Sequence, residues 1–355
     1  MLVTTSRIRL TLTTILIVLA AAGIRPATGQ ATQATPPGNA AATTTYDLPG
    51  ERVFPEGIAY DPAANAFFVG STDDGTIFRG DLETGEVEVF SGGGADGRTA
   101  VTGLKVDAEG RLYVAGRTTG TVYIYDTADG SLLARFSNEV LPSTDTLIND
   151  IAIAPDGAAY ITDSFLPTLY RITPKAGADA ADAGSATGDL VGLECFIDFT
   201  GSAFTYGDGF NANGIVATPD GAYLLIVQFD TGQLFRVDIA TQDVIEVDLG
   251  GATVRAGDGM ALDGQTLWVV RDEPGVIVPV TMADDFAAGS VGAEFGDPSF
   301  DYPTTMALVG DGTALVVNSQ LDMAGGNQPP ALPFTVSRVV LPAVILDGGE
   351  ATPAA

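Results

Sequence analysis

The sequence predicts an all-β fold built from six similar units. In each unit a short apolar stretch, a turn that usually pairs an acidic residue with glycine, and a second apolar stretch follow one another. The apolar stretches span four to seven residues and are rich in Val, Ile, Leu, Tyr and Phe, a composition that favours strands. Four strands repeated every 40 to 50 residues are typical of propeller blades. We therefore expect a six-bladed β-propeller over residues 46–342.

The units can be followed in order from their first strands, which begin at Pro55, Val101, Ile148, Ala212, Gly257 and Pro303. Pairs such as Asp156-Gly157 and Asp220-Gly221 supply the tight turns that join twisted antiparallel strands. Units one, two and four continue into third and fourth strands, over 76–78 with 86–90, 121–126 with 132–136, and 233–238 with 244–248. Outside the N-terminal segment no helical pattern exceeds two turns.

The third unit is longer than the others because it contains an extra loop. Residues 174–188 are rich in Ala, Gly and Asp, which predicts a mobile loop. A strand resumes over 190–199 and contains Cys195, the single cysteine, for which we expect a buried, inert thiol. We expect the ring to close by pairing an early strand, 46–48, with the last strand, 335–341, because this pairing leaves no exposed sheet edge.

The two ends of the chain lie outside the predicted propeller. Arg7 and Arg9 precede an apolar stretch and a small-residue cleavage motif at 27–29, so we interpret 1–29 as a signal peptide. Residues 30–45 are rich in Ala, Thr and Pro and predict a disordered linker, and 343–355 predict a flexible tail. We expect an exported protein, periplasmic or extracellular, with no stable membrane span after cleavage. An uncleaved anchor is the alternative, although the stretch is short for a span, which needs about 20 residues.

Composition excludes several classes of function. The formal net charge of −29 disfavours nucleic acid and anionic membranes as partners and favours cations, although solubility alone would also explain it. The chain contains no histidine, which excludes every histidine-based triad, general base or zinc site. A single cysteine excludes an internal disulfide. We expect a monomer that acts on a small molecule.

One position recurs at the start of each unit's first strand. It is occupied by Glu56, Thr102, Asn149, Asn213, Asp258 and Thr304, at spacings of 46, 47, 64, 45 and 46 residues. In a propeller the first strand of every blade lines the central channel, so these positions converge on the axis. The two carboxylates and two amides among them would form an all-oxygen site suited to Ca²⁺ or another hard divalent cation: Glu56, Asn149, Asn213 and Asp258. The alternative is that they are ordinary turn residues, since Asn and Asp are common at strand entries.

A second set of polar residues follows the second strand of each unit: Ser71, Arg117, Asp163, Gln228, Arg271 and Asn318. The ends of the second strands lie at the same mouth of the channel as the starts of the first, so we expect this set around the metal. We interpret five residues as binding substrate: Asn149, Arg117, Gln228, Arg271 and Asn318. The two arginines could instead form ion pairs with acids such as Asp163 or Asp272.

These motifs resemble those of the senescence marker protein/gluconolactonase family, the regucalcin-like six-bladed propellers. The matching motifs, in order and at blade spacing, are Pro55-Glu56-Gly57, Asn149-Asp150, Asn213-Gly214 and Asp258-Gly259-Met260, and the resemblance covers 46–341. It implies that Glu56, Asn213 and Asp258 bind a catalytic divalent metal. It also implies that Asn149 contacts the metal, or a metal-bound water and the substrate.

Two departures from the family pattern concern specificity. Gluconolactonases of this type carry an arginine that grips the sugar two residues before the third-blade Asn, where this chain has Leu147. Related paraoxonase-like members use histidine near the metal, and this chain has none. The resemblance therefore does not imply a sugar-lactone substrate, and a histidine-dependent mechanism is excluded.

Two functions are compatible with these features. The first is a calcium-dependent hydrolase of a lactone or related ester, with Asp258, Asp150 or Asp163 as general base. An acid that does not bind the metal would be the better base, since a bound cation lowers basicity. The second is a non-catalytic exported propeller that binds a ligand or a protein partner and uses calcium as a staple.

Overall fold

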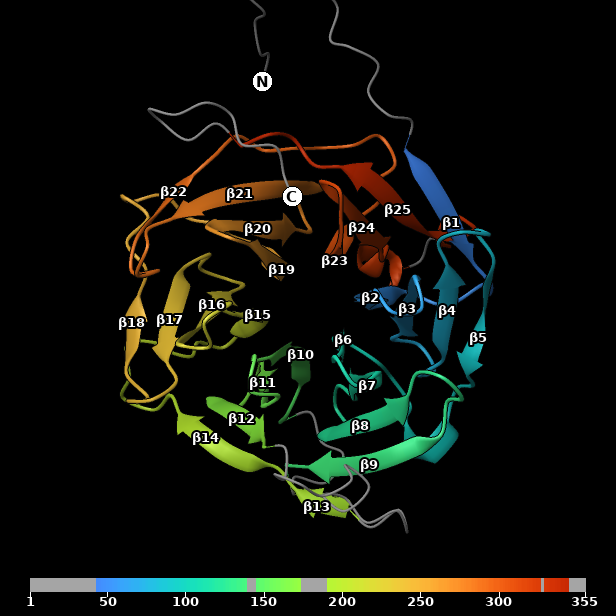
Figure 1. Cartoon of the computed structure of the whole chain (residues 1–355), viewed down its shortest axis with the longest axis horizontal. Helices are drawn as coiled ribbons and strands as arrows, with labels where there is room; N and C mark the ends of the chain where they lie inside the picture. Colours follow the sequence, from blue (N-terminus) through green and yellow to red (C-terminus); the bar gives the residue numbers. More distant parts are fainter. Residues whose placement is uncertain (1–42, 139–144, 174–189, 327–328, 345–355) are drawn as a thin grey trace, which may run out of the picture. The chain divides into compact units, whose positions relative to one another are not determined.

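The computed structural model describes residues 43–138, 145–173, 190–326 and 329–344. Their strands form six separate sheets that stand around a common centre as the blades of a propeller (Figure 1). The expected all-β, six-bladed fold is therefore confirmed. Several predicted segments lie wholly or nearly wholly outside the described residues: the signal peptide (1–29), the linker (30–45), the loop at 174–188 and the tail (343–355).

The strands of the first three blades follow from the centre outward. Blade 1 consists of β2 (Pro55–Asp61), β3 (Ala66–Ser71), β4 (Ile77–Asp81) and β5 (Val87–Ser91). Blade 2 consists of β6 (Leu104–Val106), β7 (Arg111–Ala115), β8 (Thr121–Asp126) and β9 (Leu132–Ser137), with β13 (Leu190–Gly192) at its outer edge. Blade 3 consists of β10 (Ile148–Ile153), β11 (Ala159–Asp163), β12 (Thr168–Ile172) and β14 (Glu194–Asp198).

The last three blades have the same order. Blade 4 consists of β15 (Ala212–Ala217), β16 (Tyr223–Gln228), β17 (Leu234–Asp238) and β18 (Val244–Glu246). Blade 5 consists of β19 (Gly257–Asp263), β20 (Thr266–Arg271), β21 (Val276–Met282) and β22 (Gly289–Val291). Blade 6 consists of β23 (Pro303–Gly310), β24 (Thr313–Asn318), β25 (Phe334–Val340) and the N-terminal strand β1 (Thr44–Leu48).

The ring closes through the two ends of the propeller. Strand β1 pairs antiparallel with β25, with Thr44 opposite Arg338 and Leu48 opposite Phe334. Blade 6 therefore combines three strands from the C-terminal end with one from the N-terminal end (Figure 1). This pairing confirms the predicted closure, and β1 begins two residues before the segment expected to form it.

The third unit departs from expectation in two ways. The single strand predicted over 190–199 is two strands, because β13 pairs in parallel with β9 of blade 2 whereas β14 pairs with β12 of blade 3. The chain thus covers the edge of blade 2 before it completes blade 3. The prediction of a buried thiol is also wrong, since Cys195 is exposed. It lies on β14, the outermost strand of its blade, where only part of the strand is packed.

Buried apolar side chains lie between neighbouring blades. Six clusters occur in the described residues, one at each blade interface. One cluster contains Val122 of blade 2 together with Ile161 of blade 3, and another contains Trp268 of blade 5 together with Val316 of blade 6. Because both faces of a blade are covered, its middle strands are apolar throughout rather than alternating. This packing fixes the inner strands around one axis.

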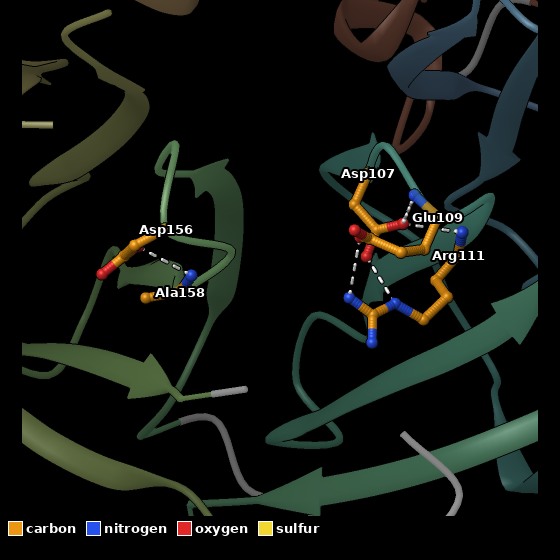
Figure 2. Close-up of polar contacts among 5 residues, drawn as sticks. All are labelled: Asp107, Glu109, Arg111, Asp156 and Ala158. Atoms are coloured by element: carbon orange, nitrogen blue, oxygen red, sulfur yellow. Dashed lines mark hydrogen bonds and ion pairs between the residues drawn. The ribbon is translucent and has the colours of Figure 1, made fainter. Parts of the chain in front are cut away.

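Many acidic residues close the turns between strands. Figure 2 shows two examples, in which Asp156 accepts a hydrogen bond from the backbone N–H of Ala158 and Asp107 accepts bonds from the N–H groups of Glu109 and Arg111. Arg111 also forms an ion pair with Asp107. The negative charge of the chain therefore has a structural role in addition to solubility.

Helical structure in the described residues is confined to two 3₁₀ turns, η1 (Ala95–Gly97) and η3 (Leu321–Met323). Neither these turns nor any other described segment forms a helix with the length and apolar character needed to cross a membrane.

Candidate metal centre and its cavity

Five blades carry a β-bulge at the recurring position, which re-aims its side chain. In blade 1, Pro55 is opposite Ser71 but Ile58 is opposite Val69, so the inner strand has one extra residue. The same register shift occurs between four other pairs of residues: Ile148/Ile151, Ala212/Ile215, Gly257/Met260 and Pro303/Met306. Bulges are common next to active sites because they turn a side chain out of the sheet. Here they release the recurring residues from the blade faces.

Adjacent inner strands approach very closely at the bulges, and small residues make this possible. A Cβ on Gly57 would lie 2.2 Å from the carbonyl oxygen of Thr102, and one on Gly214 would lie 2.2 Å from that of Asp258. The two threonines of the recurring position tie the ring together. Thr102 Oγ1 donates to the carbonyl of Ile148 at 2.8 Å, and Thr304 Oγ1 donates to that of Glu56 at 2.7 Å.

The structure brings the four predicted ligands together in one cavity. Glu56, Asn149, Asn213 and Asp258 all line it, and each is at most 6% exposed. One oxygen of each side chain is buried without a hydrogen-bond partner: Glu56 Oε2, Asn149 Oδ1, Asn213 Oδ1 and Asp258 Oδ1. Buried polar atoms are normally hydrogen-bonded, so four such acceptors in one place point to a ligand that supplies positive charge.

Hydrogen bonds determine which way the two amides face. Asn149 Nδ2 donates to Ser164 Oγ at 2.8 Å, and that hydroxyl in turn donates to the carbonyl of Ala212 at 2.8 Å. The side chain of Asn213 donates to Asp258. Both amides therefore use their N–H groups on the protein, which leaves their oxygens available to the cavity.

The electrostatics of the two acids are unfavourable in the protein alone. Burial, together with the charge of Asp150, raises the pKa of Glu56 to about 8, although Arg117 opposes the shift. Burial and the charge of Glu56 raise the pKa of Asp258 well above its ordinary value. Two buried carboxyls without a counter-charge resist joint ionisation. A divalent cation would remove this penalty.

These residues fit a hard divalent cation. Ca²⁺ takes six to eight oxygen ligands from carboxylates, amide carbonyls and solvent, and four protein oxygens would leave room for substrate. In the described part of the chain no three Asp, Glu or Cys side chains gather into a possible metal cluster. The set of four predicted ligands differs from such a cluster because two of its members are asparagines, whose amide oxygens can bind a cation without adding charge.

The cavity above this floor has a volume of about 430 Å³. Its lining also contains polar groups from Thr72, Arg117, Asp272 and Tyr302, and four large apolar side chains that we call the apolar rim: Leu147, Phe210, Phe229 and Leu321. The dimensions suit a small organic molecule. The lining thus combines four candidate metal-binding oxygens with a group of apolar side chains.

Of the second set of predicted residues, Arg117 lies in this cavity and the others hold turns or face elsewhere. Gln228 donates to the carbonyl of Thr205 at 2.8 Å, and Asn318 accepts from the N–H of Asp301 at 3.1 Å. Arg271 forms an ion pair with Glu294 at 2.6 Å. Ser71 accepts from the N–H of Asp73 at 3.2 Å. These four residues are cross-strand neighbours of the residue just before the recurring position.

The two other predicted acids are engaged with the backbone. Asp163 accepts bonds from Leu147 N at 2.9 Å, from Phe165 N at 3.0 Å and from Leu166 N at 2.9 Å. Asp150 accepts from Ile151 N at 2.8 Å and, across the blade interface, from Ile215 N at 3.1 Å. Asp150 is also buried, which raises its pKa. Its charge acts on Glu56 and Asp258, but its oxygens hold blades 3 and 4 together.

Sequence reasoning did not single out Asp272 and Tyr302 as site residues. Asp272 is 5% exposed and lines the cavity, where it accepts a hydrogen bond from the Tyr302 hydroxyl. Burial raises the pKa of Asp272 to about 6, against the bonds from Glu273 N–H and Tyr302. A partial signal is the residue that directly follows the second strand, since in three of the six blades, with Thr72, Phe229 and Asp272, it lines the cavity.

Comparison with known proteins identifies a family. Residues 54–319 match the family model described as the SMP-30/gluconolactonase/LRE-like region. No curated protein matches the chain at a significant level.

Solved structures share the fold. A calcium-binding protein, regucalcin, from Agrobacterium tumefaciens is 18% identical with a TM-score of 0.56, over 82% of this chain and 95% of its own. The allergen Mala s 1 of Malassezia sympodialis is 14% identical with a TM-score of 0.61, over 83% and 95% of the two chains. Virginiamycin B lyase from Staphylococcus aureus is 13% identical with a TM-score of 0.53, over 84% and 99%. At these identities the likeness concerns the fold alone.

Proposed function

The chain belongs to the SMP-30/gluconolactonase/LRE-like family, and from this premise we propose that it is a metal-dependent hydrolase of a lactone or related ester. The observation that carries the proposal is the set of four unpartnered, buried oxygens on the floor of the cavity. Glu56, Asn149, Asn213 and Asp258 would hold the cation. Ca²⁺ is the preferred candidate, because the donors are all oxygen and half are neutral. The calcium-binding description of regucalcin supports the same choice.

The cation, when bound, would polarise the substrate carbonyl and stabilise the negative charge that develops on its oxygen. Side chains that line the cavity would orient the substrate and accept a proton from water. Arg117 would orient a carbonyl or carboxylate oxygen from the wall, since guanidinium donors suit such groups. Two acids that line the cavity could accept a proton from water, Asp258 and Asp272. We assign the role of proton acceptor to Asp272, because it is outside the set of metal ligands and its carboxylate is positioned by Tyr302.

The alternative is a non-catalytic propeller that binds a ligand or protein partner, with the cation as a staple. Solved structures of similar fold include an allergen and a lyase. Because one fold can serve several roles, the fold alone does not decide between the hydrolase and this alternative. We also propose that the protein is exported, on the basis of its N-terminal sequence.

The deciding experiment measures metal content and hydrolysis on the same preparation. We expect about one divalent ion per chain by mass spectrometry of the purified protein, since the site is single. Hydrolysis of a lactone panel should fall at least about a hundredfold with EDTA and return with Ca²⁺, because the carbonyl loses its main electrostatic stabilisation. A chelator-sensitive melting temperature with no turnover of any lactone or ester would favour the staple function instead. Turnover that is indifferent to chelation would refute the metal mechanism.

A substitution separates the two proton acceptors. Asp272→Asn should lower kcat about a hundredfold, the usual size of a general-base effect, while Ca²⁺ affinity and melting temperature stay close to wild type. Asp258→Asn should lose the metal as well as the activity. Asp243→Asn, in an exposed turn, is the control. A wild-type kcat for Asp272→Asn would show that Asp258 or another group accepts the proton from water.

A further inference from the structure

The rim of the cavity carries apolar and aromatic side chains that are not needed to bind a cation. Phe210 and Phe229 line it together with Leu147 and Leu321. The ring centroid of Phe210 lies 5.3 Å from that of Phe165 and 5.8 Å from that of Phe229. Three phenylalanines from blades 3 and 4 thus form one continuous row beside the mouth.

Phe210, at 41% exposed, is the one aromatic residue among the five exposed large hydrophobic residues of the described chain. The loop that carries it is firmly held. Asn211, 2% exposed, donates to the carbonyls of Ser164, Gly207 and Gly209, at 3.1, 3.1 and 2.9 Å. Backbone bonds from Phe229 N to Asn211 O and from Asp230 N to Phe210 O tie the loop to blade 4. A fixed, exposed aromatic at a cavity mouth is typical of a ligand-contacting surface.

The charges around the mouth restrict what can occupy it. Asp230 and Glu273 are exposed in the cavity lining, and Arg117 is the one basic residue among the described residues of that lining. An anionic substituent would be repelled by these two carboxylates. A polyhydroxylated one would lose hydrogen bonds to water against Leu147 and the phenylalanines, which offer no side-chain donors in return.

From these observations, and resting on the hydrolase function proposed above, we infer that the substrate is a neutral lactone or ester with an apolar, aliphatic or aromatic, substituent. The carbonyl would face the metal floor and the substituent would lie on Phe210, Phe229 and Leu147. The apolar rim would contribute to binding, while the carbonyl chemistry would stay at the floor.

Kinetics on three lactones test the inference. With the Ca²⁺-loaded protein, we expect kcat/KM for γ-nonanoic lactone to exceed that for γ-butyrolactone and for D-glucono-1,5-lactone by at least about tenfold, the size typical of apolar pocket contacts. Phe210→Ala should raise KM for γ-nonanoic lactone about tenfold with little change in kcat, and leave γ-butyrolactone unaffected. Leu147→Arg should reduce the preference for the apolar substituent. Val89→Ala, an exposed residue on the outer strand β5, is the control.

A binding measurement separates this inference from the function on which it rests. 2-Pentylcyclopentanone is neutral, has a similar shape and lacks an ester bond, so calorimetry reports binding without turnover. Binding that Phe210→Ala weakens, without hydrolysis of any lactone, would support the apolar site and overturn the hydrolase. Equal kcat/KM for the three lactones, or no effect of Phe210→Ala on either assay, would overturn the inference while the hydrolase stands. No binding and no hydrolysis would overturn both.

Discussion

Replacing Glu56 with Gln is expected to stabilise the metal-free protein at pH 8 and to abolish its stabilisation by Ca²⁺. The carboxyl is buried near Asp258 and Asp150, and its pKa is raised to about 8. At pH 8 a substantial fraction is therefore ionised in a place that disfavours charge. The amide of Gln keeps the shape of the side chain without its charge, so the cost of burying a charged carboxylate disappears. The substitution also removes one of the two negative charges that would bind the cation.

The direction of the pH dependence follows from linkage. The pKa of Glu56 is about 8 in the folded chain, against 4.5 as its ordinary value. Between these two pH values the folded state holds a proton that the unfolded state has lost, so the stability of the chelated protein falls as pH rises from about 5 to 8. The effect is of the order of a few kcal/mol, and each kcal/mol is worth about 2–4 °C in a chain of this size. Ca²⁺ should reverse the trend, because it binds the ionised form.

Thermal unfolding of the chelated and Ca²⁺-loaded forms at pH 5 and pH 8 measures both effects. The chelated Glu56→Gln variant should melt several degrees above chelated wild type at pH 8 and close to it at pH 5. Added Ca²⁺ should raise the melting temperature of wild type only. Glu246→Gln, on the exposed outer strand β18, should behave as wild type throughout. A Glu56→Gln protein that still gains stability from Ca²⁺ would show that the ion binds elsewhere.

Gly214→Ala should destabilise the protein by about 3 kcal/mol or more, an effect of the overpacking kind. The new Cβ would lie 2.2 Å from the carbonyl oxygen of Asp258, and both partners are backbone at a blade interface, so neither can move alone. The displaced inner strand would also shift the oxygens of Asn213 and Asp258. We therefore expect weaker Ca²⁺ binding in whatever fraction still folds.

Gly92→Ala is the matched control for this substitution. A Cβ at Gly92 meets nothing within 4 Å. Denaturant unfolding of the two variants measures the difference in the free energy of unfolding. Closely similar midpoints for Gly214→Ala and Gly92→Ala would contradict the close approach of the inner strands.

The recurring position and the ring closure could be predicted from the sequence because both depend on repetition. The repeated motif places Glu56, Asn149, Asn213 and Asp258 at the same point of their blades, even though an inserted loop lengthens the third unit. Pairing of the first strand with the last follows from the need to leave no open sheet edge. Neither inference requires knowing which way an individual side chain faces.

The second set could not be placed from the sequence because it depends on register. Side chains alternate along a strand, so one residue decides between the cavity and the blade. Gln228 is opposite Ala212 and holds a turn, whereas Phe229, one residue later, lines the cavity. Likewise, Arg271 is opposite Gly257, whereas Asp272, one residue later, lines the cavity. Periodicity of apolar residues marks where a strand lies but does not fix its last residue to within one position, and here one position decides.

The pairing of β1 with β25 has a consequence for folding. Residues near the two ends of the propeller must meet before blade 6 is complete, and contacts between such distant segments form slowly. Until then the apolar cluster shared by blades 6 and 1 is open, with Phe67, Leu315 and Phe334 among its members. Among the described strands β1 is synthesised first, yet it can pair only after β25, at the other end of the propeller, has been made. Loss of either end would leave an unpaired strand beside an exposed core, the combination that promotes aggregation.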